Sequence, residues 1–103
     1  MTFRSPALLK LAQGAPCLIA IPGICRGRTE TVVACHSNWL EHGKGVGLKS
    51  HDAFIAFGCA ECHAAIDKRT QQLEPEDRRY YWQRGFERTV LYLFENGKLK
   101  VTP

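Results

Sequence analysis

The chain has 103 residues, a length that predicts one domain, 1–103, with a core that is small relative to its surface. Small domains usually need a cross-link, and five cysteines could supply one. The N-terminus has no signal-peptide pattern, so we expect a cytoplasmic, soluble protein whose reduced thiols favour metal over disulfides. No apolar run approaches the roughly 20 residues of a membrane span. The formal charge of +4 is compatible with a polyanionic partner but is also common among other enzymes.

The first half of the chain predicts short elements joined by turns. Residues 6–13 favour one or two helical turns ended by Gly14, and residues 17–21 read as a strand closed by the Pro22-Gly23 turn. Residues 31–35 and 53–57 are β-branched or apolar runs, with a glycine-rich stretch between them. We therefore expect two strands of a long hairpin.

The second half is predominantly helical. Good helix formers follow Cys59 and place residues 63 and 67 on one face. The clearest helix begins at Pro75, with acidic residues in its first turn, and ends near residues 96–97. Gly85 costs this helix about 1 kcal/mol of propensity, which suggests close packing there. Residues 98–102 could form a final short strand, and the helix's expected core face consists of Trp82, Phe86, Val90, Leu93 and Phe94.

Four cysteines have the spacing of a structural zinc site. Cys17 and Cys25 bracket the Pro-Gly turn, and Cys59 and Cys62 form a C-x2-C at a helix start. Each pair brings two thiolates onto one short loop, and the hairpin between them can fold back to complete a tetrahedral site. Cys35 lies within a strand and is better interpreted as a small buried apolar residue, although it could replace one of the four.

Other interpretations of the C-x2-C pair fit less well. The run from Cys59 to His63 matches the attachment sequence of c-type haem, but that chemistry belongs to exported proteins and the only methionine is Met1. A thioredoxin-like motif would follow the first strand of a βαβ unit, whereas here a hairpin precedes it. His63 could also serve as a zinc ligand in place of a cysteine.

The order of these motifs resembles a known family. Ile21-Pro22-Gly23-Ile24-Cys25, the strand ending in Ala34-Cys35-His36, and the run from Cys59 through His63 to Asp67 look like the small phage and prophage YbcO-type proteins. That family is regarded as nucleases and is related to the RecA-dependent nuclease of phages. The resemblance implies an α+β fold: a small zinc-stapled, treble-clef-like ββα-metal (HNH) domain with an additional C-terminal helix.

The resemblance implies a role for each of these residues in phosphodiester hydrolysis. The reaction needs a base to activate water and a divalent ion to hold the phosphate. His36 would be the base. His63 and Asp67 would hold a second ion, Mg²⁺ or Mn²⁺, beside the structural Zn²⁺. Asp52 falls where the family's middle Asn stands and could hydrogen-bond His36, raising its basicity.

One position departs from the family pattern. Many members have a metal-binding histidine or aspartate before the base, where this chain has Cys35, so the metal has fewer protein ligands, or the ion is softer, or activity is lost. His42 and His51, in or beside the loop, are interpreted as solvated histidines.

Two functions therefore compete. The first is a metal-dependent DNA endonuclease, acting in phage or prophage recombination with a RecA-like recombinase as a possible partner. The second is a zinc-stapled module that binds DNA or a recombination protein without cutting. No base-reading motif is visible, and the basic residues that could contact phosphates are Lys44, Lys49, Lys68, Arg69, Arg84 and Arg88, with Arg78 and Arg79 near them.

Overall fold

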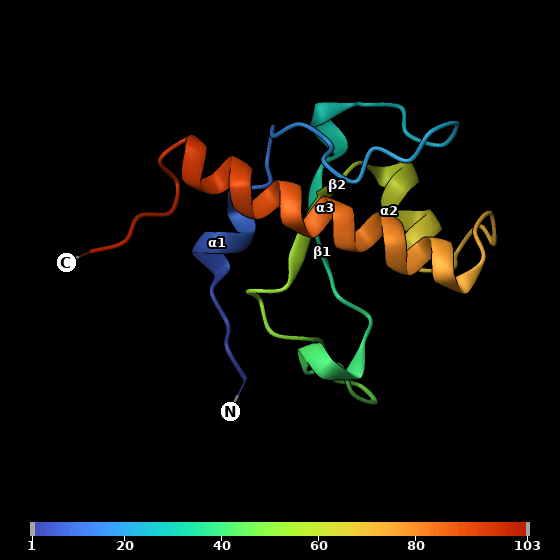
Figure 1. The fold of residues 1–103 in the computed structure, drawn as a ribbon, viewed down its shortest axis with the longest axis horizontal. Helices are drawn as coiled ribbons and strands as arrows, with labels where there is room; N and C mark the ends of the chain where they lie inside the picture. Colours follow the sequence, from blue (N-terminus) through green and yellow to red (C-terminus); the bar gives the residue numbers. More distant parts are fainter. Residues whose placement is uncertain (1, 103) are drawn as a thin grey trace.

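The structure is a computed structural model that describes residues 2–102 (Figure 1). Within this range the fold is a small α+β arrangement of three α-helices and a two-stranded sheet. In chain order the elements are α1 (Pro6–Lys10), the 3-10 turn η1 (Thr29–Thr31), β1 (Val33–His36), η2 (Leu40–His42), β2 (Ile55–Gly58), α2 (Ala60–Ile66) and α3 (Pro75–Glu95). No helix among residues 2–102 is both long and apolar enough to span a bilayer.

The sheet is the predicted hairpin, with strands shifted one or two residues along the chain. β1 and β2 are antiparallel, and Cys35 pairs with Ala56 while His36 pairs with Ile55. Successive side chains of a strand point to opposite faces. Cys35 and Ala56 therefore share one face, and His36 belongs to the other.

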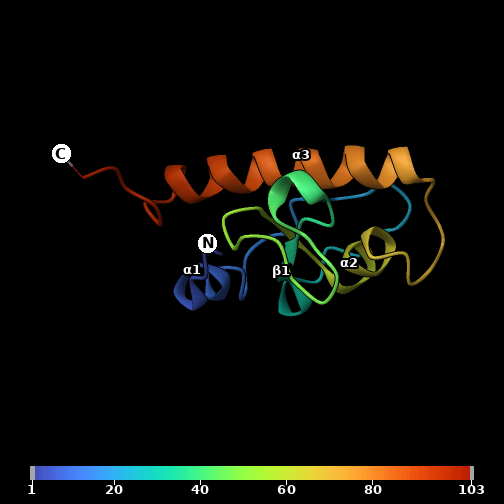
Figure 2. The ribbon, with the colours of Figure 1, turned by 90° about the horizontal axis from the view of Figure 1, so that it is seen from below.

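Helix α3 covers the face that carries Ala56. Figure 2 shows α3 along one side of the molecule, with α1, β1 and α2 on the other. The helix approaches the sheet closely at Gly85, where a β-carbon would lie 3.2 Å from Ala56 Cβ and 2.7 Å from Ile19 Cγ1. The close packing predicted at this glycine is confirmed, and it brings the helix backbone against both the sheet and the segment around Ile19.

The buried side of α3 differs in part from its predicted face. Trp82 and Leu93 are buried as expected, but Phe94 is exposed, and Thr89 is buried instead. The Thr89 hydroxyl accepts a hydrogen bond from the Phe57 amide at 3.0 Å and donates one to the Gly85 carbonyl at 2.7 Å. A polar residue can replace an apolar one here because both of its hydrogen-bonding functions are satisfied.

Two predicted strands are absent from the described residues. Residues 17–21 form an irregular segment in which the amides of Leu18 and Ile19 both donate to the Phe57 carbonyl. Ala20 has a φ of +48°, which interrupts any extended run. Residues 98–102 are also irregular, because the amides of Lys98 and Leu99 turn back to the Leu93 carbonyl at the end of α3.

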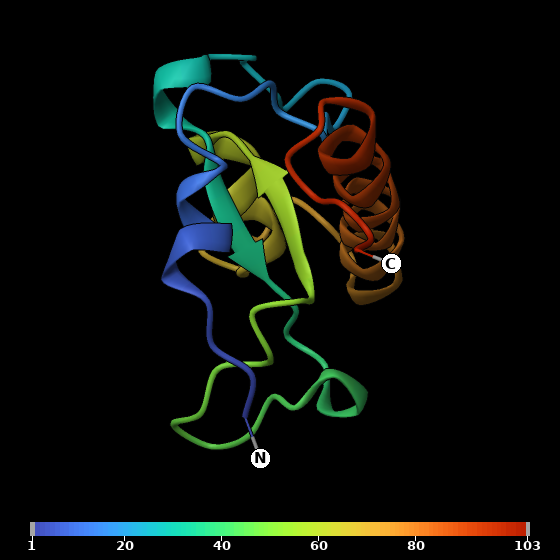
Figure 3. The same ribbon diagram turned by 90° about the vertical axis from the view of Figure 1, so that its left-hand side faces the viewer.

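A long loop, residues 37–54, leaves the sheet at the end of β1 and returns to β2. Figure 3 shows it extending away from the body of the molecule, with the N-terminal segment beside it. A backbone hydrogen bond joins the loop to the N-terminal segment, because the Asp52 amide donates to the Phe3 carbonyl at 3.0 Å. The first residues of the chain are thus attached to the base of the loop.

Candidate metal and nucleic-acid site

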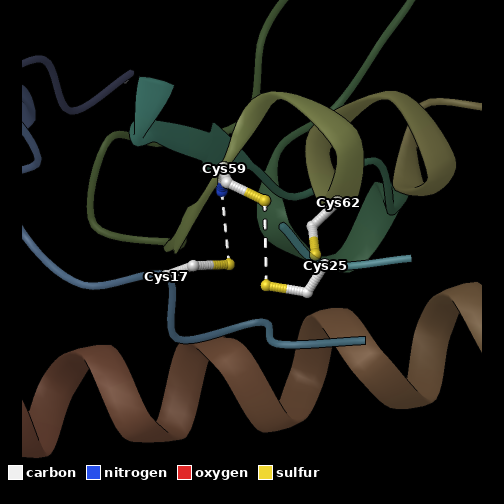
Figure 4. Close-up of side chains that lie close together, drawn as sticks. All are labelled: Cys17, Cys25, Cys59 and Cys62. Carbon is white, nitrogen blue, oxygen red and sulfur yellow. Dashed lines mark hydrogen bonds between the residues drawn. The ribbon is translucent and has the colours of Figure 1, made fainter. Parts of the chain in front are cut away.

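The four cysteines predicted to bind zinc form one cluster (Figure 4). The sulfurs of Cys17, Cys25, Cys59 and Cys62 all lie within 4.8 Å of one another, and those of Cys25 and Cys59 are 3.8 Å apart. Four sulfurs at about 2.3 Å from a tetrahedral zinc ion would be separated by about 3.8 Å. Donor type, number and spacing therefore fit a structural zinc ion.

Two short segments bring these sulfurs together. Cys59 is the N-cap of α2 and Cys62 lies in its first turn, so the C-x2-C pair faces one point. Cys25 follows a turn in which its amide and that of Ile24 donate to the Ile21 carbonyl. Gly23 adopts a φ of +78° in that turn, a conformation for which glycine is favoured.

Backbone amides around the cluster are directed at sulfur. Cys17 Sγ accepts from the amides of Ala20 at 3.4 Å and Cys59 at 3.3 Å, and Cys62 Sγ accepts from Ile21 at 3.5 Å. A hydrogen bond with Cys62, aided by these amides and opposed by burial, lowers the pKa of Cys17 to about 4. Burial raises the pKa of Cys25 to about 11. A divalent cation would allow the whole set to ionise together.

The remaining cysteine lies outside the cluster. Cys35 is buried, as predicted, and its thiol lies 3.7 Å from the Val33 carbonyl and also near the Gly58 backbone. Burial raises the pKa of the Cys35 thiol well above its ordinary value. His63 is not part of the cysteine cluster either, so the cluster is the four-sulfur set and not a three-cysteine, one-histidine set.

A cleft of about 670 Å³ opens on the sheet face opposite α3. Its walls come from α1, β1, the long loop and α2, and among residues 2–102 none of the lining side chains belongs to α3. The chemically reactive or charged side chains that line it are His36, His63, Asp67, Lys10, Lys44 and Lys49. Two imidazoles, one carboxylate and three ammonium groups thus share one opening.

His36 is held by a buried carboxylate. Its Nε2 lies 2.7 Å from Oδ1 of Asp52, whose residue is only 2% exposed. Asp52 Oδ1 also meets the Arg4 guanidinium at 3.1 Å, and Oδ2 accepts from the Ser5 amide at 2.7 Å. Burial alone would raise the pKa of Asp52, but the bonds from His36 and Ser5 and the charge of Arg4 hold it below its usual value. Asp52 is therefore an ionised, fully engaged partner.

The second pair lies on α2. His63 Nε2 is 2.9 Å from Asp67 Oδ2, the one-turn contact expected for residues four apart. Asn38, just after β1, donates to Asp67 Oδ1 at 3.1 Å and so connects the His36 strand to α2. Burial would raise the pKa of Asp67, but hydrogen bonds from His63 and Asn38 and the charge of Arg69 lower it overall.

Comparison with known proteins decides the family. The model of the family described as "Putative nuclease YbcO" matches residues 6–98. The chain belongs to the YbcO family. It is 33% identical over 93 residues to "Putative nuclease YbcO" of Escherichia coli K12 and to "Putative nuclease ybcO" of Enterobacteria phage 82, covering 90% of this chain and 96% of each relative. A solved structure, "Structure of a putative bacteriophage protein from Escherichia coli str. K-12 substr. MG1655", superposes with a TM-score of 0.71 at 29% identity, over 87% of this chain and 99% of that one.

The basic residues proposed from the sequence of this YbcO-family chain do not form one surface. Lys44 and Lys49 line the cleft, and Lys68 and Arg69 are exposed just after α2. The Arg84 guanidinium donates to the carbonyls of Ile19 and Ala20 at 2.8 and 2.9 Å, so it stabilises the segment after Cys17, and its contact with phosphates stays a prediction. Arg88 is exposed on α3, which covers the other face of the sheet.

The two loop histidines are a correction, because neither is fully solvated. The ring of His42 stacks on Phe54 with centroids 4.4 Å apart, and its Nδ1 lies 2.6 Å from the Ser37 hydroxyl. Burial lowers the pKa of His42. His51 Nδ1 accepts from the Phe3 amide at 2.9 Å. Both histidines anchor the long loop.

Three residues of the site were missed from the sequence. Arg4 and Lys10 lie before the recognised motifs, and their roles depend on the N-terminal segment returning to the loop and to β1. Asn38 carried a local signal, since it follows the strand that ends in His36, but its partner is 29 residues away. Only the tertiary fold reveals these contacts.

Proposed function

We propose that this chain is a divalent-metal-dependent endonuclease of the HNH (ββα-metal) type, with a treble-clef-like zinc site, that hydrolyses DNA phosphodiester bonds. One observation carries the proposal: His36, oriented by a buried aspartate, lines the same cleft as the His63–Asp67 pair. The nuclease names of the relatives support it.

His36 would act as the general base. When Nε2–H donates to Asp52, the Nδ1 lone pair is left to accept a proton from water. Asp52 holds the ring in that tautomer and stabilises the imidazolium that forms, as a buried aspartate does for a catalytic histidine in other enzymes. Arg4 and the Ser5 amide in turn fix Asp52.

His63 and Asp67 would hold the catalytic Mg²⁺ or Mn²⁺. Such an ion, when bound, positions the scissile phosphate and neutralises charge on the leaving oxygen. Asp67 supplies a hard oxygen donor, and Asn38 orients its carboxylate. The cysteine cluster, which includes the N-cap and first turn of α2, would fix the helix that presents both residues.

Cationic side chains would bring DNA to this cleft. Lys10, Lys44 and Lys49 line it and would contact phosphates without reading bases. The relative from Enterobacteria phage 82 supports a role in phage or prophage DNA processing. A cytoplasmic location and a RecA-like recombinase partner are part of the proposal to be tested.

The test is cleavage of supercoiled plasmid by zinc-loaded protein, with Mg²⁺ or Mn²⁺ added or omitted. We expect nicking to require the added ion and to fall by roughly 10²–10⁴-fold in His36→Ala. Asp67→Asn should also lose activity, whereas Asp77→Asn, the same change at an exposed position of α3, should retain it. Full activity in His36→Ala would refute the assignment.

One observation favours the non-catalytic alternative. Cys35 is buried and does not line the cleft, so β1 offers no metal ligand beside His36. If wild-type protein binds DNA but does not nick it with either ion, the chain is a zinc-stapled DNA-binding or recombinase-binding module. The same set of purified variants distinguishes the two functions.

A further inference from the structure

The long loop exposes apolar side chains, one in η2 and two at its tip, the Gly45–Leu48 turn, beside the cationic cleft. Leu40 is 81% exposed and Leu48 is 45% exposed, while Val46 is fully exposed. Single exposed apolar residues are ordinary on protein surfaces. Here three of them lie on one 9-residue stretch, 40–48. Lys44, within this stretch, and Lys49, just after it, line the cleft that holds His36.

The tip is an ordered turn. Gly45 and Leu48 exchange two backbone hydrogen bonds, of 3.0 and 3.1 Å, around Val46 and Gly47. Gly47, the third residue of the turn, has a φ of +67°, which a type II turn requires at that position. This geometry places Val46 at the apex, with its side chain free of packing contacts.

The base of the loop is fixed to the body of the protein. The His51 amide donates to the His42 carbonyl at 3.0 Å, and the His42 ring packs against Phe54 and Trp82. Gly43 is required there, because a β-carbon would lie 2.8 Å from the His51 ring. Contacts with the hydrophobic core therefore hold the loop in position when its tip contacts a partner.

The unpaired positive charges near the loop tip favour a polyanionic partner. Glu41, which lies in η2, is paired with Arg79 at 2.5 Å, and Asp52 is buried against Arg4 and His36. Within residues 2–102 neither Lys44 nor Lys49 forms an ion pair with an acidic side chain, so both ammonium groups remain available to a polyanion.

From this combination we infer that Val46, supported by Leu48, is a wedge that inserts between base pairs of duplex DNA held against the cleft. Apolar side chains inserted at a base step unstack it and kink the duplex, and the cost is least where stacking is already weak. The wedge makes mismatched or otherwise destabilised duplex the preferred substrate. This inference rests on the proposed function for its location, but it concerns binding and not cleavage.

The test measures binding without added Mg²⁺ or Mn²⁺, so that no cleavage occurs while zinc stays in the cysteine cluster. A labelled duplex carries 2-aminopurine beside a central mismatch, and a fully paired duplex of the same length is the comparison. We expect wild-type protein to bind the mismatched duplex roughly tenfold more tightly and to raise 2-aminopurine fluorescence, because unstacking is already partly complete. Val46→Ser should lose the preference and the fluorescence rise but keep the salt dependence that the lysines provide.

Val101→Ser is the matched control, because it makes the same change at a valine that is 85% exposed but lies outside the loop and the cleft. It should behave as wild type. Val46→Phe, with a larger apolar side chain at the same open apex, should retain the preference and the fluorescence rise. Equal discrimination by wild type and Val46→Ser would overturn the inference.

The binding and cleavage results separate the two proposals. A wedge effect in protein that never nicks DNA would support the inference and refute the endonuclease. Nicking by a Val46→Ser variant with unchanged mismatch preference would support the endonuclease and refute the wedge.

Discussion

Replacing Asp52 by asparagine removes one negative charge from the most highly connected side chain of the site and keeps its shape. In the wild type, one carboxylate oxygen accepts from the Ser5 amide and the other faces His36 and Arg4, all donors. An asparagine has one oxygen and one NH₂ group. Whichever way it is turned, its NH₂ group opposes at least one protein donor within a buried site.

The magnitude follows from these contacts. A hydrogen bond to a charged group contributes about 1.5–3 kcal/mol, and an unsatisfied buried donor costs about 1–3 kcal/mol. Because Arg4 is partly exposed and can turn toward water, we expect Asp52→Asn to lower the free energy of unfolding by about 2–4 kcal/mol near pH 7. If the NH₂ group faces His36, the ring must take the tautomer that cannot act as a base through Nδ1, so nicking should fall by roughly 10²–10⁴-fold.

Urea unfolding of zinc-saturated protein across pH measures the stability effect. The pKa of Asp52 is lowered in the fold, so its stabilisation is fully present above the unfolded value of about 3.9 and is lost as pH falls through the folded value. The difference in the free energy of unfolding between wild type and Asp52→Asn should therefore become smaller below about pH 4. Asp77→Asn is the control at an exposed site. Equal free energies of unfolding for Asp52→Asn and Asp77→Asn at pH 7 would refute the hydrogen-bond network assigned to Asp52.

Four further substitutions probe the metal cluster and the core. Cys62→Ser should lose bound zinc and unfold the domain, whereas Cys35→Ala should keep one zinc per chain; elemental analysis of the purified proteins measures both, and folded wild type without zinc would contradict the prediction. Gly85→Ala should destabilise by about 1–2 kcal/mol in urea, because the new methyl would lie 3.1 Å from the Ile19 Cα and overpacking outweighs the helix-propensity gain; a stabilised variant would show that the contact relaxes. Thr89→Val should cost about 1–3 kcal/mol, because the buried β2 amide loses its acceptor, and unchanged stability would mean that water replaces the hydroxyl.

Local patterns in the sequence predicted those features that depend on neighbouring residues. The helix that begins at Pro75 and the C-x2-C pair at the start of α2 follow from spacing and capping within a few residues. The four-cysteine cluster was also predicted, because thiolates have few uses in a small reduced domain other than metal binding. Membership of the YbcO family was indicated by the same motifs.

Features that depend on distant partners were not predictable. Residues 17–21 have strand-like composition, yet Ala20 bends the chain so that Cys17 can join the cluster and Ile19 can pack under Gly85. Arg84 appeared to belong to a basic helix face, but the carbonyls it binds lie about 65 residues earlier in the chain. Arg4 reaches Asp52 across 48 residues, a contact that no local pattern encodes.

The cysteine cluster complicates the usual inhibition experiment. Its four sulfurs join residues 17–25 to residues 59–62, so an ion held there would clamp parts of the chain that are far apart in sequence. A chelator that removes all divalent ions would then unfold the domain and also remove any catalytic ion. Inactivation by EDTA would therefore not identify a metal-dependent reaction in this protein unless a structural probe, such as circular dichroism, showed that the fold had survived.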